Sequence, residues 1–320
     1  MTAVSDISGL ILVDKPEGMT SFSVVSRIRR ILGIKKAGHA GTLDPFATGL
    51  LTIAAGQSTR VLRYLEHDGK TYRATMGLGR ITSTGDIEGE TIGGRIPDDT
   101  ERNALSETNY QQIKDAISSM VGEITQVPSA YSAIKIAGRP AYDYARKGQE
   151  VEIPSRKVTI HEILVHRIWE EEGEIRVDMT VSCSKGTYIR TLCEDIGQKL
   201  GWGGYCVALR RILSGAFDIE NAYTLEAIEE MVKAGDRAFL MDEKEALSSL
   251  PSIVVSEREA RDLRNGKKLD FYIFKDRMET IVEQDPDARV LALWEDRPVA
   301  VIYVEDQEGE TLIREERVFA

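Results

Sequence analysis

The chain has 320 residues, of which 42% are hydrophobic and 29% are charged, and its formal net charge at pH 7 is −11. A chain of this length can bury one large core and a smaller one, so we expect two domains. No apolar stretch reaches the length of a membrane span, and the amino terminus lacks a basic region followed by an apolar run. These features exclude a membrane-embedded protein and predict a cytoplasmic one.

The cysteines exclude two further classes of protein. The chain contains Cys183, Cys193 and Cys206, an odd number with no Cys-x-x-Cys spacing. Neither a disulfide framework nor a zinc site is indicated by this pattern. A reducing compartment fits such cysteine usage.

Charge is distributed unevenly along the chain. Residues 218–320 carry 26 acidic and 14 basic side chains, a net charge of −12. Residues 1–217 carry the other 26 acidic and 27 basic side chains, a net charge of +1. Basic residues in the first part cluster in segments 27–36, 135–147 and 185–211. Such clusters can attract RNA phosphates despite an acidic total, although each one alone is equally compatible with a solvated helix face.

Hydrophobic periodicity in the first 120 residues predicts a mixture of strands and helices. Residues 10–13 form an apolar run typical of a buried strand, and apolar side chains at helical spacing predict a helix over 25–32. Alternation over 71–78 predicts a strand with one buried face. Residues 79–107 are rich in Gly, Thr, Asp and Glu and predict a long loop, whereas 110–120 predict an amphipathic helix.

A second strand and helix raise a question about one arginine. Unbroken alternation over 175–183 predicts a strand, and the apolar stripe over 189–200 predicts a helix with Thr187 as its N-cap. Arg190 then lies in the first helical turn, where a cation opposes the helix dipole at a cost of up to about 1 kcal/mol. We therefore expect an anionic partner, either Glu194 one turn further on or a carboxylate from elsewhere in the chain.

The last 70 residues predict a small β-rich domain. A boundary is expected near residue 250, and Ser256 and Glu259 form a capping box for a short helix that ends at 265–266. Three strand-like runs follow, over residues 271–274, 290–294 and 299–304. The turn 295–298 joins the last two of them.

One carboxylate lies in an unusually constrained loop. Residues 38–45 read GHAGTLDP and contain Asp44. The glycines permit turns that other residues resist, and Pro45 restricts the residue before it to extended backbone. The loop therefore aims the Asp44 carboxylate, although an Asp-Pro pair alone also fits a plain surface turn.

Ordered motifs accompany this loop along the first 217 residues. They are GLILVDKPEGMTS at 9–21, GHAGTLDPFATG at 38–49, KTY with a Gly- and Thr-rich continuation at 70–89, VPSAYSAIK at 127–135, SKGTYIRTL at 184–192 and LRR at 209–211. Together they closely resemble the motifs of the TruB family of tRNA pseudouridine synthases.

The resemblance implies an α+β fold of the pseudouridine-synthase type, with a mixed, largely antiparallel sheet flanked by helices. It implies a catalytic domain over 1–249, an RNA-gripping insertion over about 127–157, and a small β-rich, PUA-like domain over 250–320. Whether this acidic C-terminal domain contacts RNA is left open by its charge.

The resemblance also implies a reaction that uses no metal or organic cofactor. Family members convert uridine to pseudouridine by breaking the bond from N1 to the ribose and rejoining the base through C5. Asp44 matches the catalytic aspartate, which acts as a nucleophile or a base, and Arg190 matches its arginine partner. Such a carboxylate needs an adjacent cation to be ionised while partly buried.

The family's remaining site residues can be carried over individually. Tyr72 matches a tyrosine that stacks on the flipped base, although its pattern also fits a core tyrosine. Tyr188 and Leu209 match pocket residues. His39 matches a histidine that fills the space vacated by the flipped base, and Lys15 matches a motif lysine that supports the active-site loop.

Two other functions are the alternatives to this one. A phosphate-binding loop at 38–41 would indicate a nucleotide hydrolase, but the required Gly-Lys-Ser/Thr ending is absent. A non-catalytic tRNA-binding or remodelling protein on the same scaffold is the second alternative, and the presence of Asp44, Tyr72 and Arg190 favours catalysis over it.

The resemblance further implies the partner. We expect tRNA, bound through its T-arm, with the uridine at position 55 of the T-loop as the target. The insertion over about 127–157 favours the stand-alone form over relatives that depend on a guide RNA, and we expect a monomer with no membrane partner.

Overall fold

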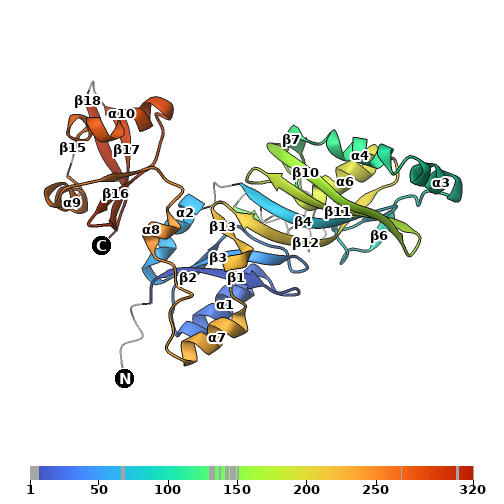
Figure 1. The fold of residues 1–320 in the computed structure, drawn as a ribbon, viewed down its shortest axis with the longest axis horizontal. Helices are drawn as coiled ribbons and strands as arrows, with labels where there is room; N and C mark the ends of the chain where they lie inside the picture. The colour runs from blue at the N-terminus through green and yellow to red at the C-terminus, as the bar shows by residue number, and fades with distance from the viewer. Residues whose placement is uncertain are drawn as a thin grey trace.

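The computed structural model describes residues 7–65, 69–129, 134–136, 138–140, 144, 149, 151–267, 269–307 and 310–319. In these residues the chain builds a nine-stranded and a five-stranded sheet, with helices packed on them. Figure 1 shows the smaller sheet at one end of the molecule, beyond helices α2 (Leu62–Leu65) and α8 (Glu243–Ala246), and α3 (Asp99–Glu107) at the opposite end. The α+β fold class is confirmed.

The large sheet has the order β1-β3-β12-β4-β11-β10-β7, with β2 beside β3 and β13 beside β12. Its pairs are antiparallel, except that β12 runs parallel to β3. The strands are β1 (Gly9–Lys15), β2 (Ala37–Ala40), β3 (Thr48–Ala55), β4 (Lys70–Leu78), β7 (Gly122–Gln126), β10 (Arg156–Glu171), β11 (Glu174–Cys183), β12 (Gly204–Ser214) and β13 (Phe217–Asp218).

The parallel pair places two motifs side by side and requires a glycine. Gly49 of β3 is in register with Arg211 of β12. A Cβ on Gly49 would lie 2.3 Å from the carbonyl oxygen of Arg211, and the Gly49 φ of +101° is one that side chains rarely adopt. The backbone contact therefore explains why the motif at 38–49 ends in glycine.

Helices cover the sheet where apolar side chains need burial. Helix α1 (Ser21–Leu32) packs against β2 and α7 (Leu225–Lys233), and α6 (Ile189–Lys199) packs on β12 and contacts α4 (Gln111–Ser118). Gly197 and Gly204 make the α6 contact possible, because a Cβ on Gly197 would lie 2.2 Å from the Gly204 nitrogen. Within the described residues, no helix has both the length and the apolar character of a membrane span.

The smaller sheet has the order β14-β16-β17-β18-β15. Its strands are β14 (Ser252–Val254), β15 (Leu269–Asp270), β16 (Val290–Trp294), β17 (Arg297–Gln307) and β18 (Glu310–Val318), and its helices are α9 (Glu257–Arg264) and α10 (Lys275–Gln284). The predicted capping box of Ser256 and Glu259 begins α9. An apolar cluster containing Leu10, Leu50, Leu291 and Phe319 joins the two sheets, so the division into domains at residue 250 stays a prediction.

Three local predictions were wrong. The segment 79–107 contains the hairpin β5 (Ile81–Thr82) and β6 (Thr91–Gly93) and helix α3, because Asp98 and Glu101 form a capping box that the Gly- and Thr-rich composition obscured. Residues Phe271–Ile273 form a 3-10 helix, started by the Asp270 carboxylate, rather than a strand. Thr187 does not cap α6, because the helix begins at Ile189 and Tyr188 therefore occupies the N-cap position; the Thr187 hydroxyl donates to the carbonyl of Ser184.

The predicted insertion is described only in part. The strands β8 (Lys135–Ile136) and β9 (Arg139–Pro140) pair as a hairpin. About half of the rest of the prediction falls on residues 130–133, 137, 141–143, 145–148 and 150, which lie outside the described residues.

Candidate active site

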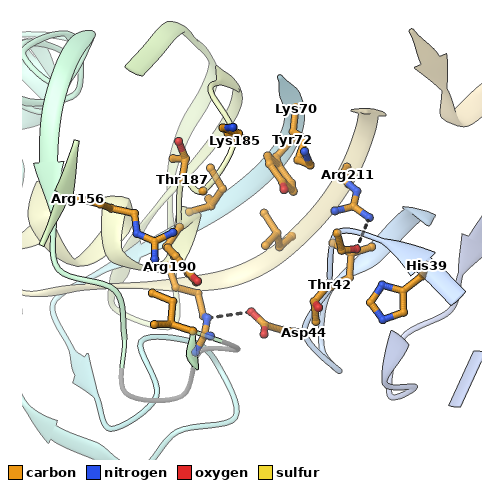
Figure 2. A pocket seen from close by; sticks show the side chains of 17 residues that line it. His39, Thr42, Asp44, Lys70, Tyr72, Arg156, Lys185, Thr187, Arg190 and Arg211 are labelled. Atoms are coloured by element: carbon orange, nitrogen blue, oxygen red, sulfur yellow. Dashed lines mark hydrogen bonds and ion pairs between the residues drawn. The ribbon is translucent and has the colours of Figure 1, made fainter. Parts of the chain in front are cut away.

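A cavity of about 450 Å³ opens where β2, β4, α6 and β12 meet the Asp44 loop (Figure 2). Six of the seven predicted site residues line it: His39, Asp44, Tyr72, Tyr188, Arg190 and Leu209. Five cations also line it, namely Lys70, Arg156, Lys185, Arg190 and Arg211. A cavity with this excess of positive charge suits a ligand that carries phosphate.

The Asp44 loop is held by backbone contacts on both sides. The hydroxyl of Ser21 donates to the carbonyl of Leu43 (3.0 Å) and accepts from the Leu43 N–H (2.9 Å). The Gly18 N–H donates to the Pro45 carbonyl at 2.8 Å. These bonds fix the residues before and after Asp44, so the carboxylate is aimed rather than mobile.

Arg190 pairs with Asp44 inside the cavity. Its Nε lies 3.0 Å from Oδ2 of Asp44, and the two side chains are 4% and 32% exposed. Its Nη1 lies 3.2 Å from Oδ2 of Asp86 and donates to the Thr84 carbonyl at 2.6 Å. Arg190 lies in the first turn of α6, as predicted, and two carboxylates from distant parts of the chain offset its unfavourable place in the helix dipole.

The electrostatics of Asp44 balance burial against charge. Burial raises the pKa of Asp44, and Asp86 raises it further, whereas Arg190 and Lys15 lower it. Because the Asp44 pKa is raised despite Arg190, losing that arginine would favour the protonated form. Arg190 is thus the group that most favours an ionised Asp44.

Asp86 was assigned no role from the sequence. It is 4% exposed, and its Oδ1 accepts from the Thr84 hydroxyl (2.6 Å) and from the Glu88 N–H (3.1 Å). Its Oδ2 is thereby directed at Arg190. The sequence signal is the Thr- and Asp-containing continuation of the motif at 70–89, which has the composition of an ordinary turn.

Tyr72 and Leu209 lie on neighbouring strands and face the same cavity. They are 7% and 8% exposed, on β4 and β12 respectively. Burial raises the pKa of Tyr72, so its phenol is neutral. Together the two side chains provide an aromatic face and an apolar wall.

His39 and Arg211 also line the cavity, and Arg211 of β12 is in register with Tyr72 of β4. His39 lies on β2 rather than in a loop, and its buried Nδ1 has no hydrogen-bond partner among the described residues. Burial and the nearby Arg211 lower the pKa of His39, which favours the neutral imidazole. Arg211 is 1% exposed and donates to the carbonyls of Leu50 (2.7 Å) and Gly41 (3.2 Å), so it supports the Asp44 loop as well as lining the cavity.

Tyr188 and Lys15 complete the predicted set. Tyr188 is the N-cap residue of α6, and Gln126 holds its backbone through two hydrogen bonds of 3.0 and 3.2 Å. Lys15 is fully buried behind the loop and is not a lining residue of the cavity. Its Nζ donates to the carbonyls of Pro16, Met19 and Pro45 at 2.8, 2.6 and 3.2 Å.

The described fold and cavity correspond to a known class of RNA-modifying enzyme. Residues 29–189 match the N-terminal domain of TruB family pseudouridylate synthases, and residues 190–250 match the C-terminal domain of tRNA pseudouridylate synthase B. The chain belongs to the TruB family of tRNA pseudouridine synthases, which are isomerases.

Individual relatives cover nearly the whole chain. The tRNA pseudouridine synthase B of Corynebacterium diphtheriae is 43% identical over 93% of this chain and 96% of its own length. The tRNA pseudouridine synthase B of Streptococcus thermophilus is 40% identical over 91% of this chain and 96% of its own length.

Two solved structures share the fold at 25% sequence identity. Each match covers 98% of this chain and 85% of the chain in the solved structure. One is an H/ACA RNP bound to a substrate RNA containing 2′-deoxyuridine (TM-score 0.68), and the other is a Cbf5-Nop10-Gar1 complex (TM-score 0.69).

Proposed function

We propose that this protein isomerises the uridine at position 55 in the T-loop of tRNA to pseudouridine, with Asp44 as the catalytic carboxylate. The observation that carries the proposal is the Asp44–Arg190 ion pair of 3.0 Å, in a cavity that also presents Tyr72 and Leu209. A single nucleotide base fits a cavity of about 450 Å³, and phosphates on either side would meet the cations that line it.

The reaction needs no exchange of atoms with a cofactor. The bond from N1 of uracil to C1′ of the ribose breaks, the base turns, and a bond from C5 to C1′ forms. C5 then loses its proton, and N1 gains one. An ionised carboxylate suits this chemistry as a nucleophile at C1′ or at the base, or as a base at C2′.

Arg190 acts on the protonation and position of Asp44. Its charge lowers the Asp44 pKa against the effect of burial, and its 3.0 Å contact holds Oδ2 in place. Both effects are present before the substrate binds, so they require no reorganisation during the reaction.

The target base must leave the T-loop stack to reach Asp44. Tyr72 offers a face for stacking, which is worth about 1–3 kcal/mol per base and offsets part of the unstacking cost. Leu209 and Tyr188 form further walls of the pocket. His39, whose buried Nδ1 has no partner among the described residues, would fill the space that the flipped base leaves, and Lys15 supports the loop from behind.

We further propose that the protein acts on the T-arm of tRNA as a monomer without a guide RNA. The relatives at 40% identity and above are named as tRNA enzymes, which supports tRNA as the substrate. The catalytic part would be residues 1–249, and a PUA-like domain would be residues 250–320.

Mapping the modified position tests this proposal. An unmodified tRNA transcript is incubated with the protein, and carbodiimide adducts are located by primer extension. We expect one stop that reports pseudouridine at position 55, absent in a transcript with cytidine there. Binding of the transcript without any modification would instead indicate the tRNA-remodelling function.

A further inference from the structure

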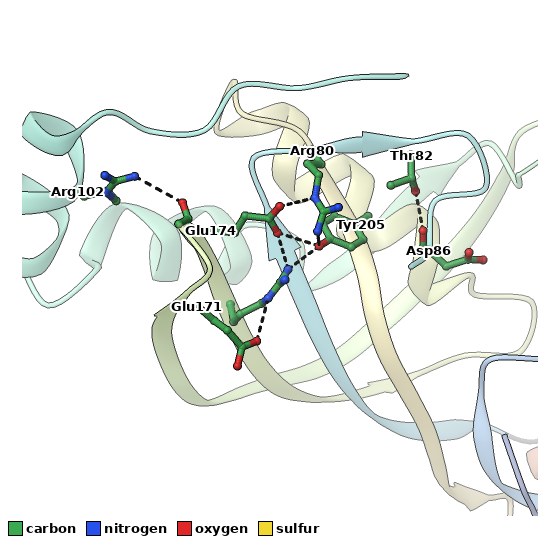
Figure 3. A network of polar contacts seen from close by, with 9 residues as sticks. Arg80, Thr82, Asp86, Arg102, Glu171, Glu174 and Tyr205 are labelled. Atoms are coloured by element: carbon green, nitrogen blue, oxygen red, sulfur yellow. Dashed lines mark hydrogen bonds and ion pairs between the residues drawn. The ribbon is translucent and has the colours of Figure 1, made fainter. Parts of the chain in front are cut away.

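A buried polar cluster lies at the end of the large sheet away from the cavity (Figure 3). Glu174 and Arg176 of β11 and Tyr205 of β12 are 6%, 4% and 0% exposed. Arg176 Nη1 donates to Glu174 Oε2 (2.7 Å) and to the Tyr205 hydroxyl (2.6 Å), and that hydroxyl donates to Glu174 Oε2 (2.8 Å). Each polar atom named here has a partner inside the protein.

Strand β4, which lies between β11 and β12, makes room for this cluster. Gly77 of β4 is in register with Arg176 on one side and with Tyr205 on the other. A Cβ on Gly77 would lie 2.4 Å from Arg176 Nη1 and 2.5 Å from Tyr205 Cε1. The guanidinium and the phenol therefore meet over a glycine, which accounts for a glycine inside a central strand.

Stability alone is a poor explanation for such a cluster. Burying charged groups costs desolvation energy, and apolar residues of similar volume are often at least as stable in the same place. What a satisfied polar network provides instead is a single, well-defined geometry. The question is which part of the molecule needs that geometry.

The cluster continues directly into the segment that holds Arg190. Arg80 donates to the Tyr205 hydroxyl, forms an ion pair with Glu174, and stacks over the Tyr205 ring at 4.7 Å. It immediately precedes β5, where the Thr82 hydroxyl donates to the Asp86 carbonyl at 2.8 Å.

A second link runs through the next residue of β12. The Cys206 N–H donates to the Gly85 carbonyl at 3.0 Å, and the backbones of Cys206 and Asp86 form an isolated parallel β-bridge. Tyr205 and Glu174 thus hold the segment 80–86 at Arg80, and Cys206 holds it at Gly85 and Asp86. That segment supplies the Thr84 carbonyl and the Asp86 carboxylate that bind Arg190.

We propose that Glu174, Arg176, Tyr205 and Arg80 are positioning residues for pseudouridine formation: they fix the segment 80–86, and through Asp86 they hold Arg190 against Asp44. This inference rests on the proposed function, because it takes Asp44 and Arg190 as the reacting pair. None of the four residues lines the cavity.

Replacing Tyr205 by phenylalanine removes one hydroxyl and keeps the ring. Tyr64→Phe is the matched control, because the Tyr64 hydroxyl is also buried but has no hydrogen-bond partner in the part of the chain that the structure describes. For both variants the rate of a single turnover on tRNA is measured from acid to alkaline pH, together with tRNA affinity and the urea midpoint. The full-length protein is used throughout.

We expect Tyr205→Phe to lower the single-turnover rate by about 10-fold, within the range that a small misplacement of catalytic groups costs, with tRNA affinity unchanged. The acidic limb of the pH profile should move to higher pH, because a less well held Arg190 lowers the Asp44 pKa less. In an Asp86→Asn background the same substitution should cause no further loss. Tyr64→Phe should match the wild type in rate and in profile.

A wild-type rate and pH profile in Tyr205→Phe would overturn the inference. So would a lower rate whose acidic limb is unshifted and whose loss adds fully to the loss caused by Asp86→Asn. If Tyr205→Phe fails to fold, Arg80→Met gives the same test from the partly exposed side of the cluster. An active wild type with inactive Asp44→Asn leaves the proposed function standing whichever result Tyr205→Phe gives. A wild type without product overturns both.

Discussion

The Nε atom of Arg190 lies 3.0 Å from Oδ2 of Asp44, although Arg190 lies in the first turn of α6 and Asp44 lies in a loop almost 150 residues earlier in the chain. Burial disfavours the charged form of Asp44, and Arg190 opposes that effect. The same guanidinium is tied to Asp86 and to the Thr84 carbonyl. Arg190 therefore couples the position of the carboxylate to its ionisation.

Arg190→Lys tests this coupling while keeping the positive charge. A lysine ammonium cannot reproduce the forked contacts of the guanidinium with Asp44, Asp86 and the Thr84 carbonyl. We expect the single-turnover rate to fall by about 100-fold and the loss to grow as the pH is lowered, because the Asp44 pKa rises. Rate measurements between acid and alkaline pH check this, and a loss that is the same at every pH would argue against control of ionisation.

Tyr72 provides a test of base stacking. Tyr72→Leu removes the aromatic face, and we expect it to lower the rate by roughly 10- to 100-fold, the equivalent of about 1–3 kcal/mol of stacking. Tyr72→Phe keeps the ring and serves as the matched control, with a much smaller loss. Single-turnover rates of the two variants decide the point, since equal losses would mean that the hydroxyl rather than the ring matters.

Glu194 should make stability depend on pH. Burial raises its pKa to about 7, despite the opposing charge of Arg190. The native state keeps this proton up to about that pH, whereas the unfolded chain releases it near 4.5, so stability falls as the pH rises between the two values. Glu194→Gln should raise the free energy of unfolding by up to about 3 kcal/mol at pH 8 and change it little at pH 4. Urea titrations at both values measure this, and a larger gain in acid would have the wrong sign.

Lys15 should stabilise the Asp44 loop more than it binds substrate. Lys15→Met removes the side-chain donor of the Pro16 and Met19 carbonyls and leaves the Pro45 carbonyl with the Gly18 N–H alone, and we expect a loss of about 2–3 kcal/mol in the free energy of unfolding. Lys244→Met is the control, because its pair with Asp296 is exposed and is worth at most about 1 kcal/mol. Equal losses in urea titrations would remove Lys15 from this role.

The sequence predicted the site better where motifs carried the information than where local composition did. Asp44, Tyr72 and Arg190 converge on one cavity because β12 pairs with β3 and β4, and α6, which carries Arg190, packs on β12. Asp86 escaped notice because a buried carboxylate in a Thr- and Gly-rich turn has the same local pattern as an exposed one. Helix α3 was missed for a related reason, since its capping box lies in a polar segment.

The cluster around Tyr205 could not be predicted from the sequence at all. Glu174 and Arg176 fit the polar positions of a strand with ordinary alternation, and Tyr205 fits an apolar one. Only the register of three strands shows that Gly77 lies between Arg176 and Tyr205. Cross-strand neighbours of this kind are set by tertiary pairing rather than by residues adjacent in the chain.

The central claim is that Asp44 converts uridine to pseudouridine, and release of tritium from C5 of uridine in an unmodified tRNA transcript tests it most directly. Forming the bond from C5 to C1′ must expel the hydrogen on C5. We expect the wild-type protein to release tritium and Asp44→Asn to release none while still binding the tRNA. Release by Asp44→Asn at the wild-type rate would contradict the assignment of the catalytic carboxylate.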